Sequence, residues 1–239
     1  MVGVKNVTKE PNKVVRQNID LIYKIIEVAN QQKKLKKICF SSTSEVYANS
    51  VNFGISKIPS SEKDLITVCP ETSDRDSYFL SKLICEKILI LSKKPVLILR
   101  LHNIYGPRMG YSHVIPEMFI KIRRNRNFIS VFSHNHTRAF CYISDAIDQI
   151  KFLTHKRSAK NKIFNIGNDQ EEIKILDLVK KILRVLKQKR KLIIKKHIKG
   201  SPRRRCPNMK LNYSITKKKP LVNLTSGILK TYNWYKNRI

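Results

Sequence analysis

Short apolar runs alternate with longer segments of helical periodicity, and this alternation is the feature that most constrains the fold. Apolar residues recur at helical spacing in 12–33 and 75–93, whereas 36–42, 95–101 and 162–167 are short apolar runs typical of buried strands. Strands that alternate with helices form parallel βαβ units, so the sequence predicts an α/β protein with a parallel sheet. Ligands of such sheets bind beyond the carboxyl ends of the strands.

The first of these runs ends in a polar stretch that is longer than a turn requires. Residues 41–47 read SSTSEVY, so four hydroxyl side chains and a glutamate follow the apolar run directly. A turn needs one or two such residues. In a parallel sheet the stretch would lie at the carboxyl end of a strand, where ligands bind. The sequence therefore predicts that residues 41–47 belong to an active site.

A tyrosine and a lysine four residues apart, Tyr78 and Lys82, lie in the predicted helix 75–93. This spacing places both side chains on one helix face. A nearby ammonium stabilises a phenolate, so we expect Lys82 to lower the pKa of Tyr78, which would then serve as a general base. The hydroxyl of Thr43, at the preceding strand end, would hydrogen bond the same oxygen of the substrate.

The pattern Tyr-x-x-x-Lys is weak evidence by itself, because this lysine-rich chain contains it three times. It begins at Tyr78, Tyr213 and Tyr232. Only Tyr78 follows an apolar run that ends in Ser and Thr, and only Tyr78 precedes a second run, 95–101, that leads into polar residues. The context therefore selects Tyr78 as the catalytic candidate.

A formal net charge of +32 is the most unusual number in the composition. A polyanion-binding protein would explain it, and so would a general bias toward lysine, since the basic residues are spread along the chain. Aromatic residues are not interleaved with the basic clusters, as a stacking platform for single strands requires. We therefore favour the compositional bias and do not expect nucleic acid as a partner. The clusters lie at 187–191, 195–199, 203–205 and 217–219.

Cysteine usage and apolar patterning narrow the class of protein further. The five cysteines include no Cys-x-x-Cys pair, which argues for a reducing compartment and against a disulfide framework or a zinc site. No apolar run approaches the roughly 18–20 residues of a membrane helix, and the first residues show no secretory pattern. We expect a cytoplasmic protein with no membrane span and no metal. The cysteines are Cys39, Cys69, Cys85, Cys141 and Cys206.

Seven segments together resemble one family, the NAD-dependent epimerase/dehydratases of nucleotide sugars, which are extended short-chain dehydrogenase/reductases. The segments are SSTSEVY, SYFLSK, LRLHNIYGPR, HVIPEMFIKI, TRAFCYISDAI, FNIGN and GSPRRRCPN. They occur in the family's order over nearly the whole chain. The resemblance implies a Rossmann-like parallel sheet with a smaller α/β substrate-binding part after it, and NAD as the cofactor.

The resemblance also implies roles for individual residues. Thr43, Tyr78 and Lys82 match the catalytic Ser/Thr, Tyr and Lys, and Ser44 and Glu45 match positions that assist the second chemical step. The arginines among the substrate-binding positions would hold the diphosphate as bidentate donors. The implied cofactor-binding residues are Asn18, Ser42, Tyr78, Lys82 and His102, and the implied substrate-binding residues are Asn103, His113, Arg138 and Arg205.

Several of these residues also have simpler interpretations. Glu45 could cap a turn, His102 could be a packed strand residue, and Arg138 could be a surface arginine on a strand. Asn208 stands where the family has Asp, which weakens the assignment of Arg205.

The activity implied by the resemblance is oxidation of the sugar at C4, followed by redirection of the 4-keto intermediate. We expect an epimerase similar to UDP-glucose 4-epimerase. The sequence Thr-Ser-Glu at 43–45 leaves UDP-glucuronate decarboxylation open, and nucleotide-sugar 4,6-dehydration is a further alternative. An alternative of another class is an inactive fragment or polyanion-binding scaffold, which a steep salt dependence of nucleic-acid binding would support.

The family's first element, a strand followed by Gly-x-x-Gly-x-x-Gly, has no counterpart in this sequence. Its glycines let backbone amides approach the cofactor pyrophosphate. The seven glycines here include no two at that spacing. We therefore expect a partial Rossmann-like sheet without its first strands, an exposed apolar edge at 36–42, and weak or no NAD binding by this chain alone. A start placed too late, a degenerate gene or a separate N-terminal fragment would each explain the pattern.

The expected domain organisation follows the resemblance. Residues 1–109 would form the C-terminal half of the NAD-binding domain, and residues 110–239 the nucleotide-sugar-binding region, with 163–168 returning to the main sheet. Relatives often dimerise through two helices of each subunit, so 12–33 and 75–93 are the expected contacts of a homodimer.

Overall fold

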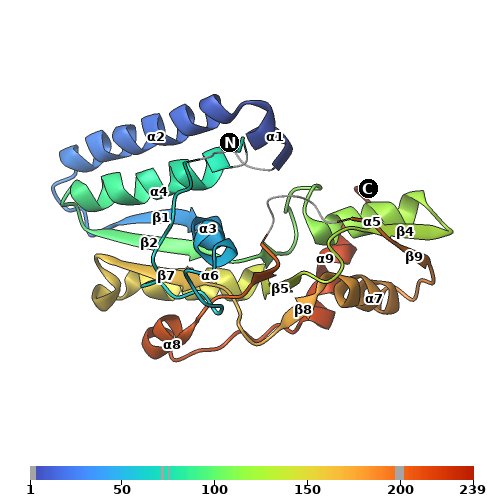
Figure 1. Cartoon of the computed structure of the whole chain (residues 1–239). Helices are drawn as coiled ribbons and strands as arrows, with labels where there is room; N and C mark the ends of the chain where they lie inside the picture. The colour runs from blue at the N-terminus through green and yellow to red at the C-terminus, as the bar shows by residue number, and fades with distance from the viewer. Residues whose placement is uncertain (1–3, 71–72, 75, 197–201) are drawn as a thin grey trace.

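A parallel sheet of three strands, in the order β1-β2-β7, forms the centre of the larger part of the molecule (Figure 1). The strands are β1 (Ile38–Thr43), β2 (Val96–Leu101) and β7 (Lys162–Ile166). Because all three run in one direction, their carboxyl ends meet at one edge. The computed structural model describes residues 4–70, 73–74, 76–196 and 202–239. The α/β class and the parallel sheet predicted from the sequence are confirmed.

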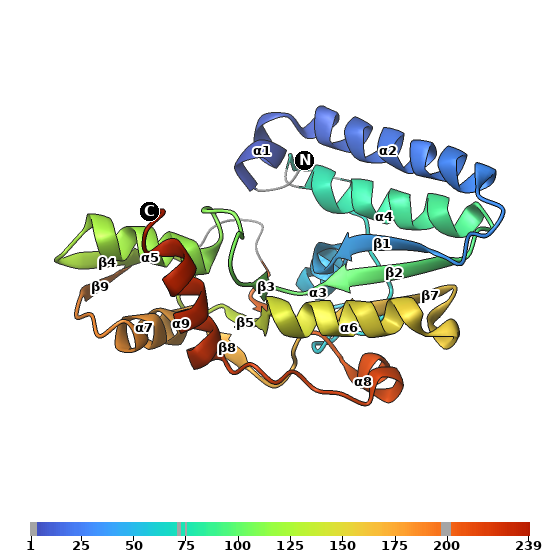
Figure 2. The ribbon, with the colours of Figure 1, turned by 180° about the vertical axis from the view of Figure 1, so that it is seen from behind.

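Helices cover both faces of this sheet (Figures 1 and 2). The helices α2 (Pro11–Gln31) and α4 (Asp76–Leu91) pack against each other on one face. On the other face lie α6 (Ile143–His155) and α8 (Lys210–Thr216), which both contact β7. Among the described residues, none of the helices combines the length and apolar character needed to cross a membrane.

The side chains of β2 alternate between two apolar cores, as the period of a strand requires. Val96 packs with Ile22 and Leu89 beneath α2 and α4. Leu97 and Leu99 belong to the core on the α6 side. Burial on both faces explains why the strands appear in the sequence as continuous apolar runs rather than alternating ones.

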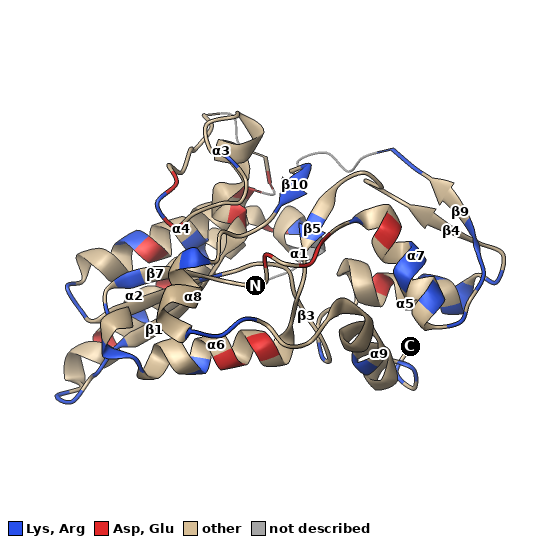
Figure 3. Ribbon diagram, turned by 90° about the horizontal axis from the view of Figure 1, so that it is seen from below, with Lys and Arg blue, Asp and Glu red and all other residues tan. Residues whose placement is uncertain are grey.

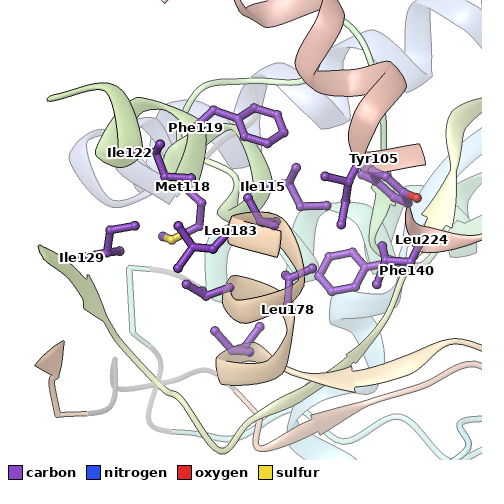
Figure 4. Packing of buried hydrophobic residues seen from close by; sticks show 14 of the residues in the cluster. Tyr105, Ile115, Met118, Phe119, Ile122, Ile129, Phe140, Leu178, Leu183 and Leu224 are labelled. Carbon is purple, nitrogen blue, oxygen red and sulfur yellow. The ribbon is translucent and has the colours of Figure 1, made fainter. Parts of the chain in front are cut away.

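A second group of elements builds a core of its own around α5 (Val114–Arg124), α7 (Ile175–Val185) and α9 (Leu224–Tyr235). Figure 4 shows Phe119 of α5 and Leu178 of α7 within this core. The sheets around it pair β4 with β9 and arrange the others as β10-β5-β8, while β3 pairs with β6. The strands are β3 (Ile104–Tyr105), β4 (Phe128–Val131), β5 (Thr137–Ala139), β6 (Cys141–Tyr142), β8 (Glu172–Lys174), β9 (Lys191–Ile194) and β10 (Arg204–Arg205).

Short elements lie where the sequence predicted loops. Residues 48–74, rich in Asn, Ser, Gly and Pro, and the polar residues 200–208 indicate loops in the sequence. The first segment contains α3 (Ala48–Asn52) and the second contains β10, while residues 71, 72, 200 and 201 lie outside the described residues. Residue 75, the expected start of a helix, and residues 197–199 of one basic cluster also lie outside them. Elements this short depend on tertiary pairing rather than on local periodicity. The remaining short helices are α1 (Val4–Lys9), η1 (Ser44–Tyr47) and η2 (Arg157–Ala159).

The sequence of residues 139–145, AFCYISD, indicates a strand that runs into a helix, and this strand prediction is wrong over its last three residues. Helix α6 begins at Ile143, directly after β6, and Asp145 lies in its first turn. An acidic residue is favourable at this place because of the partial positive charge of a helix N-terminus.

Basic residues occur on both groups of elements. Figure 3 shows Lys and Arg from α6 in one group to β9 and α7 in the other. This distribution agrees with basic residues that are spread along the chain.

Candidate active site at the strand ends

The carboxyl end of β1 carries three of the predicted catalytic residues in direct succession. Thr43 is the last residue of β1, and its Oγ1 accepts a hydrogen bond from the backbone N–H of Glu45 at 3.2 Å. Thr43 is therefore the N-cap of η1, in which Ser44 and Glu45 are the first two residues. The interpretation of Glu45 as a turn cap is wrong, because Thr43 fills that role and the Glu45 carboxylate points elsewhere.

Helix α4 brings Tyr78 and Lys82 to the same strand end. The phenol of Tyr78 lies near the side chain of Thr43. The ammonium of Lys82 donates to the backbone oxygen of Ser41 at 2.9 Å and lies over the ring of Phe40. The trio selected from the sequence, Thr43, Tyr78 and Lys82, therefore converges at the carboxyl end of β1.

The pKa of Tyr78 differs from the expectation. Burial raises this pKa above the ordinary value of a tyrosine, and the nearby carboxylate of Glu45 raises it further. The nearby side chain of Thr43 acts in the opposite direction but is outweighed. Burial also lowers the pKa of Lys82. The predicted lowering of the Tyr78 pKa is wrong for this structure, because desolvation disfavours the phenolate.

The two predicted substrate arginines, Arg138 and Arg205, are neighbours on adjacent strands. Strands β10 and β5 are parallel, and Arg205 lies directly opposite Arg138 in their register. Arg138 is only 9% exposed, so its interpretation as a surface arginine is wrong. Nη2 of Arg205 lies 2.9 Å from Oε2 of Glu45. Nη1 of Arg138 donates to the backbone oxygens of Thr137 and Arg203, which holds this guanidinium where β5 meets β10.

Strand β10 is held in place by a second arginine. Arg204 binds the carboxylate of Glu172 with two hydrogen bonds of 2.7 Å, and Thr137 of β5 donates to the same carboxylate. The hydrogen bonds from Arg204 hold the pKa of Glu172 below its usual range. This contact fixes the strand that carries Arg205.

His102 and Asn103 follow β2 at the same edge of the sheet. His102 is 1% exposed, and its Nε2 lies 3.0 Å from Oδ1 of Asn165. Burial lowers the pKa of His102 to about 3, so its ring is neutral near pH 7. Asn103 has a positive φ of 38°, and its side-chain amide donates to the backbone oxygen of Ala139. His102 is thus a packed residue that also reaches the candidate site.

Three other predicted site residues lie at its periphery. The Ser42 hydroxyl donates to the carboxylate of Glu86, and the Asn18 amide donates to the hydroxyl of Ser81, one residue before the catalytic lysine. Both side chains therefore hold elements together beneath the site. His113 is the exposed N-cap residue of α5, and its side chain forms no capping hydrogen bond.

A buried ion pair beneath the site was not predicted from the sequence. Arg100 of β2 donates from Nε and Nη2 to the two carboxylate oxygens of Glu86 on α4, at 3.0 and 2.7 Å. Their side chains are 3% and 2% exposed. Nη1 of Arg100 also donates to the hydroxyl of Tyr47 at 2.8 Å. The two partners lie on different elements, so no local pattern could have identified the pair.

The size of the hollows on the surface does not identify this site. A groove of about 530 Å³ lies between α6 and residues 216–221, away from the strand ends. A much smaller hollow adjoins the candidate site and is lined by Ser44, His102 and Arg205, among others. No group of three or more His, Cys, Asp or Glu side chains that could hold a metal occurs within the described part of the chain.

Residues 2–167 match the model of the NAD dependent epimerase/dehydratase family. The chain belongs to this family. By family it is therefore an enzyme, and the resemblance stated from the sequence motifs is confirmed.

Similar proteins carry out several different reactions. The UDP-N-acetyl-alpha-D-glucosaminuronate decarboxylase of Bacillus cytotoxicus is 27% identical, over 99% of this chain and 74% of that protein. The dTDP-D-glucose 4,6-dehydratase of Dictyostelium discoideum is 29% identical, over 76% of this chain but only 42% of that protein. A solved UDP-glucuronic acid 4-epimerase from Bacillus cereus, in complex with UDP-glucuronic acid and NAD, shares the fold with a TM-score of 0.78. It is 21% identical and covers 93% of this chain and 68% of that one.

The family is NAD-dependent, and the candidate site suits one half of this cofactor. The ammonium of Lys82 lies at the end of β1, where it donates to the backbone oxygen of Ser41. Nδ1 of His102 is a buried nitrogen without a hydrogen-bond partner among the described residues. Both suit the nicotinamide half. No pair of glycines in the sequence has the spacing of a pyrophosphate-binding loop. The residues of this chain therefore fit the nicotinamide half of NAD and not its pyrophosphate.

Proposed function

We propose that this chain acts on a nucleotide sugar, with Tyr78 as the acid–base residue and Thr43 and Lys82 as its partners. The observation that carries the proposal is the convergence of these three residues and the Glu45–Arg205 pair at one edge of the sheet. Bound NAD supplies the acceptor and the donor of hydride. Tyr78 takes the proton of the sugar 4-hydroxyl, and Thr43 holds the same oxygen by a hydrogen bond.

The paired arginines define the other end of the proposed substrate. Arg138 and Arg205 lie opposite each other in the register of β5 and β10, and Arg205 is paired with Glu45. A diphosphate matches this arrangement because each guanidinium can donate two parallel hydrogen bonds to it. The sugar would then lie between the arginines and Tyr78.

Epimerisation at C4 is the reaction that we propose first. It needs only one acid–base residue, because Tyr78 can take the proton from the 4-hydroxyl and return it to the 4-keto oxygen after the sugar has turned. The three residues at the end of β1, Thr43, Tyr78 and Lys82, are sufficient for this reaction, and no second acid–base residue is required.

Decarboxylation of a uronate is the second candidate, with 4,6-dehydration as a related alternative. The sequence Thr43-Ser44-Glu45 is the feature that favours a uronate substrate. In this reaction the 4-keto uronate is a β-keto acid, so its carboxylate leaves as carbon dioxide and the carbon takes up a proton. The similar protein of Bacillus cytotoxicus is a decarboxylase of a uronate.

The test is product analysis with the full chain and millimolar NAD. UDP-glucose and UDP-glucuronate are supplied separately, and the products are identified by NMR. Tyr78→Phe is expected to lower turnover by at least about 100-fold, the usual contribution of an acid–base residue. Tyr232→Phe, which removes a hydroxyl from another Tyr-x-x-x-Lys pattern, serves as the matched control and should leave turnover unchanged. Equal activity of the Tyr78 variant and the control would contradict the proposal.

A separate calorimetric titration measures the affinity of the chain for NAD. Because the chain carries no glycine pair suited to the pyrophosphate, we propose that NAD binds to it more weakly than micromolar. A calorimetric titration that gives a micromolar Kd would contradict this part of the proposal. The turnover assay at millimolar NAD would still stand.

We also propose that the chain forms a homodimer through α2 and α4. Both helices expose large apolar side chains, among them Val28 at 57%, Ile84 at 39% and Leu91 at 77%. Sedimentation velocity is expected to give a dimer for the wild type and a monomer for Val28→Lys combined with Leu91→Lys. Leu65→Lys, on the loop after α3 and 74% exposed, is the control that should stay dimeric. A monomeric wild type would refute the proposal.

A further inference from the structure

Asn165 of β7 joins four segments that are far apart in the sequence. Its side chain is fully buried. Oδ1 of Asn165 accepts a hydrogen bond from the Tyr47 hydroxyl at 3.0 Å and lies 3.0 Å from Nε2 of His102. Nδ2 of Asn165 donates to the backbone oxygens of Ser60 at 2.9 Å and Asn208 at 3.2 Å. One side chain therefore uses both of its donors and both acceptor sites.

These partners fix the orientation of the amide and the protonation of its neighbours. The two backbone oxygens of Ser60 and Asn208 require the nitrogen of Asn165 on their side, so the oxygen faces Tyr47 and His102. Both of these groups must then donate. Burial keeps the pKa of Tyr47 far above its usual value, so its hydroxyl retains the proton. The neutral ring of His102 carries its hydrogen on Nε2.

Tyr47 links Asn165 to the turn that carries Glu45. Tyr47 is the last residue of η1, and Glu45 is the second. Its hydroxyl is held from two sides, by Arg100 at 2.8 Å and by Asn165 at 3.0 Å. The position of the whole turn therefore depends on the contact with β7.

The other side of Asn165 holds the segment that carries Arg205. Asn208 lies three residues after Arg205, and its backbone N–H donates to Ser60 at 2.7 Å. The backbone N–H of Ser60 in turn donates to Cys206 at 2.9 Å. Because Asn165 binds the oxygens of both Ser60 and Asn208, it ties this pair of segments to β7.

We propose that Asn165 is a positioning residue that holds the Glu45 turn and the Arg205 segment at a fixed separation. The two segments meet at the Glu45–Arg205 ion pair of 2.9 Å, 160 residues apart in the sequence. The roles of Glu45 and Arg205 rest on the proposed function, but the mechanical coupling through Asn165 does not. A side chain held by packing and four hydrogen bonds is rigid enough to maintain such a geometry.

Hydrogen–deuterium exchange of the full chain tests this coupling without any assay of activity. Asn165→Ala leaves several buried polar groups unpaired and risks unfolding, so Tyr47→Phe is the primary variant. It removes the hydroxyl that connects η1 to Asn165, which is also the acceptor of the hydrogen bond from Nη1 of Arg100. The matched control is Tyr105→Phe, since Tyr105 is equally buried and its hydroxyl has no partner among the described residues.

The expected result is selective. In Tyr47→Phe, backbone amides of residues 44–52 and also of residues 204–210 exchange at least about threefold faster than in the wild type, whereas those of β4 and β9 do not change. Tyr105→Phe leaves both segments at their wild-type rates. Faster exchange confined to residues 44–52, or an equal rise throughout the chain, would overturn the proposal.

The affinity for UDP supplies a second measurement. It would not change if Asn165 only stabilised the fold. Calorimetry is expected to show at least about fivefold weaker UDP binding for Tyr47→Phe, with UDP binding by Tyr105→Phe unchanged. Unchanged binding by Tyr47→Phe would overturn the positioning role. If the wild type binds no UDP, the proposed function fails, and the exchange experiment still decides whether Asn165 couples the two segments.

Discussion

The buried histidine of the candidate site makes the stability of the chain depend on pH in a defined range. His102 is 1% exposed, and burial lowers its pKa to about 3 in the folded chain. An unfolded chain has an ordinary histidine pKa of about 6.5. Below that pH the unfolded state binds a proton that the folded state does not. Stability is therefore complete above pH 6.5 and is lost as the pH falls toward 3.

The size of the effect follows from the two pKa values. Between pH 7.5 and pH 5 the protonation of the unfolded state costs about 2 kcal/mol of stability, and the limit near pH 3 is about 5 kcal/mol. Glu62 works against this change, because burial raises its pKa and the folded state then takes up a proton earlier than the unfolded one. Comparing the wild type with a variant that changes His102 alone cancels the contribution of Glu62, because both proteins contain this residue.

The assay is urea unfolding at pH 7.5 and pH 5 for the wild type and for His102→Phe, with the free energy extrapolated to water. Phenylalanine keeps an aromatic ring beside Tyr47, whose ring centroid lies 5.8 Å from that of His102. We expect the wild type to lose about 2 kcal/mol more than the variant between these two pH values. A difference below about 0.5 kcal/mol would show that His102 can bind a proton in the folded chain, and would refute the reasoning.

Two further predictions concern packing and buried charge. Glu86→Gln should lower the free energy of unfolding by about 3–5 kcal/mol, because Arg100 keeps a buried charge without its partner. The control is Asp20→Asn, which breaks an exposed ion pair and should change the free energy of unfolding by less than about 1 kcal/mol in the same urea titration. Gly227→Ala places a Cβ 1.9 Å from the hydroxyl oxygen of Tyr105 and should lower the melting temperature despite the better helix propensity of alanine. Adding Tyr105→Phe to that variant should restore part of the loss, and no recovery would contradict the steric cause.

The main elements of the larger part of the fold could be predicted from the sequence because their signals are local. The helical spacing in 12–33 and 75–93 corresponds to α2 and α4, and the apolar runs 36–42 and 95–101 correspond to β1 and β2. The short strands β5, β8 and β10 have no such signal. They have two or three residues each, and they exist because they pair with one another.

The residues of the candidate site also fall into those that local sequence patterns predict and those that only tertiary contacts bring together. Tyr78 could be selected from the sequence over the other two tyrosines of the same pattern, because only Tyr78 lies on a predicted helix between two strands that end in polar residues. The sequence also placed Thr43 at a strand end. Both conclusions depend on neighbours within one βαβ unit.

Which distant groups face one another, and how burial shifts their pKa values, depends on the folded structure. The register of β10 and β5 sets Arg205 beside Arg138, and the same pairing brings Arg205 to Glu45. Burial and the Glu45 carboxylate then raise the pKa of Tyr78, where the local Lys82 alone predicted a lower one. The physical reason is that periodicity acts over one or two turns of chain, whereas strand register and desolvation depend on segments more than 100 residues apart.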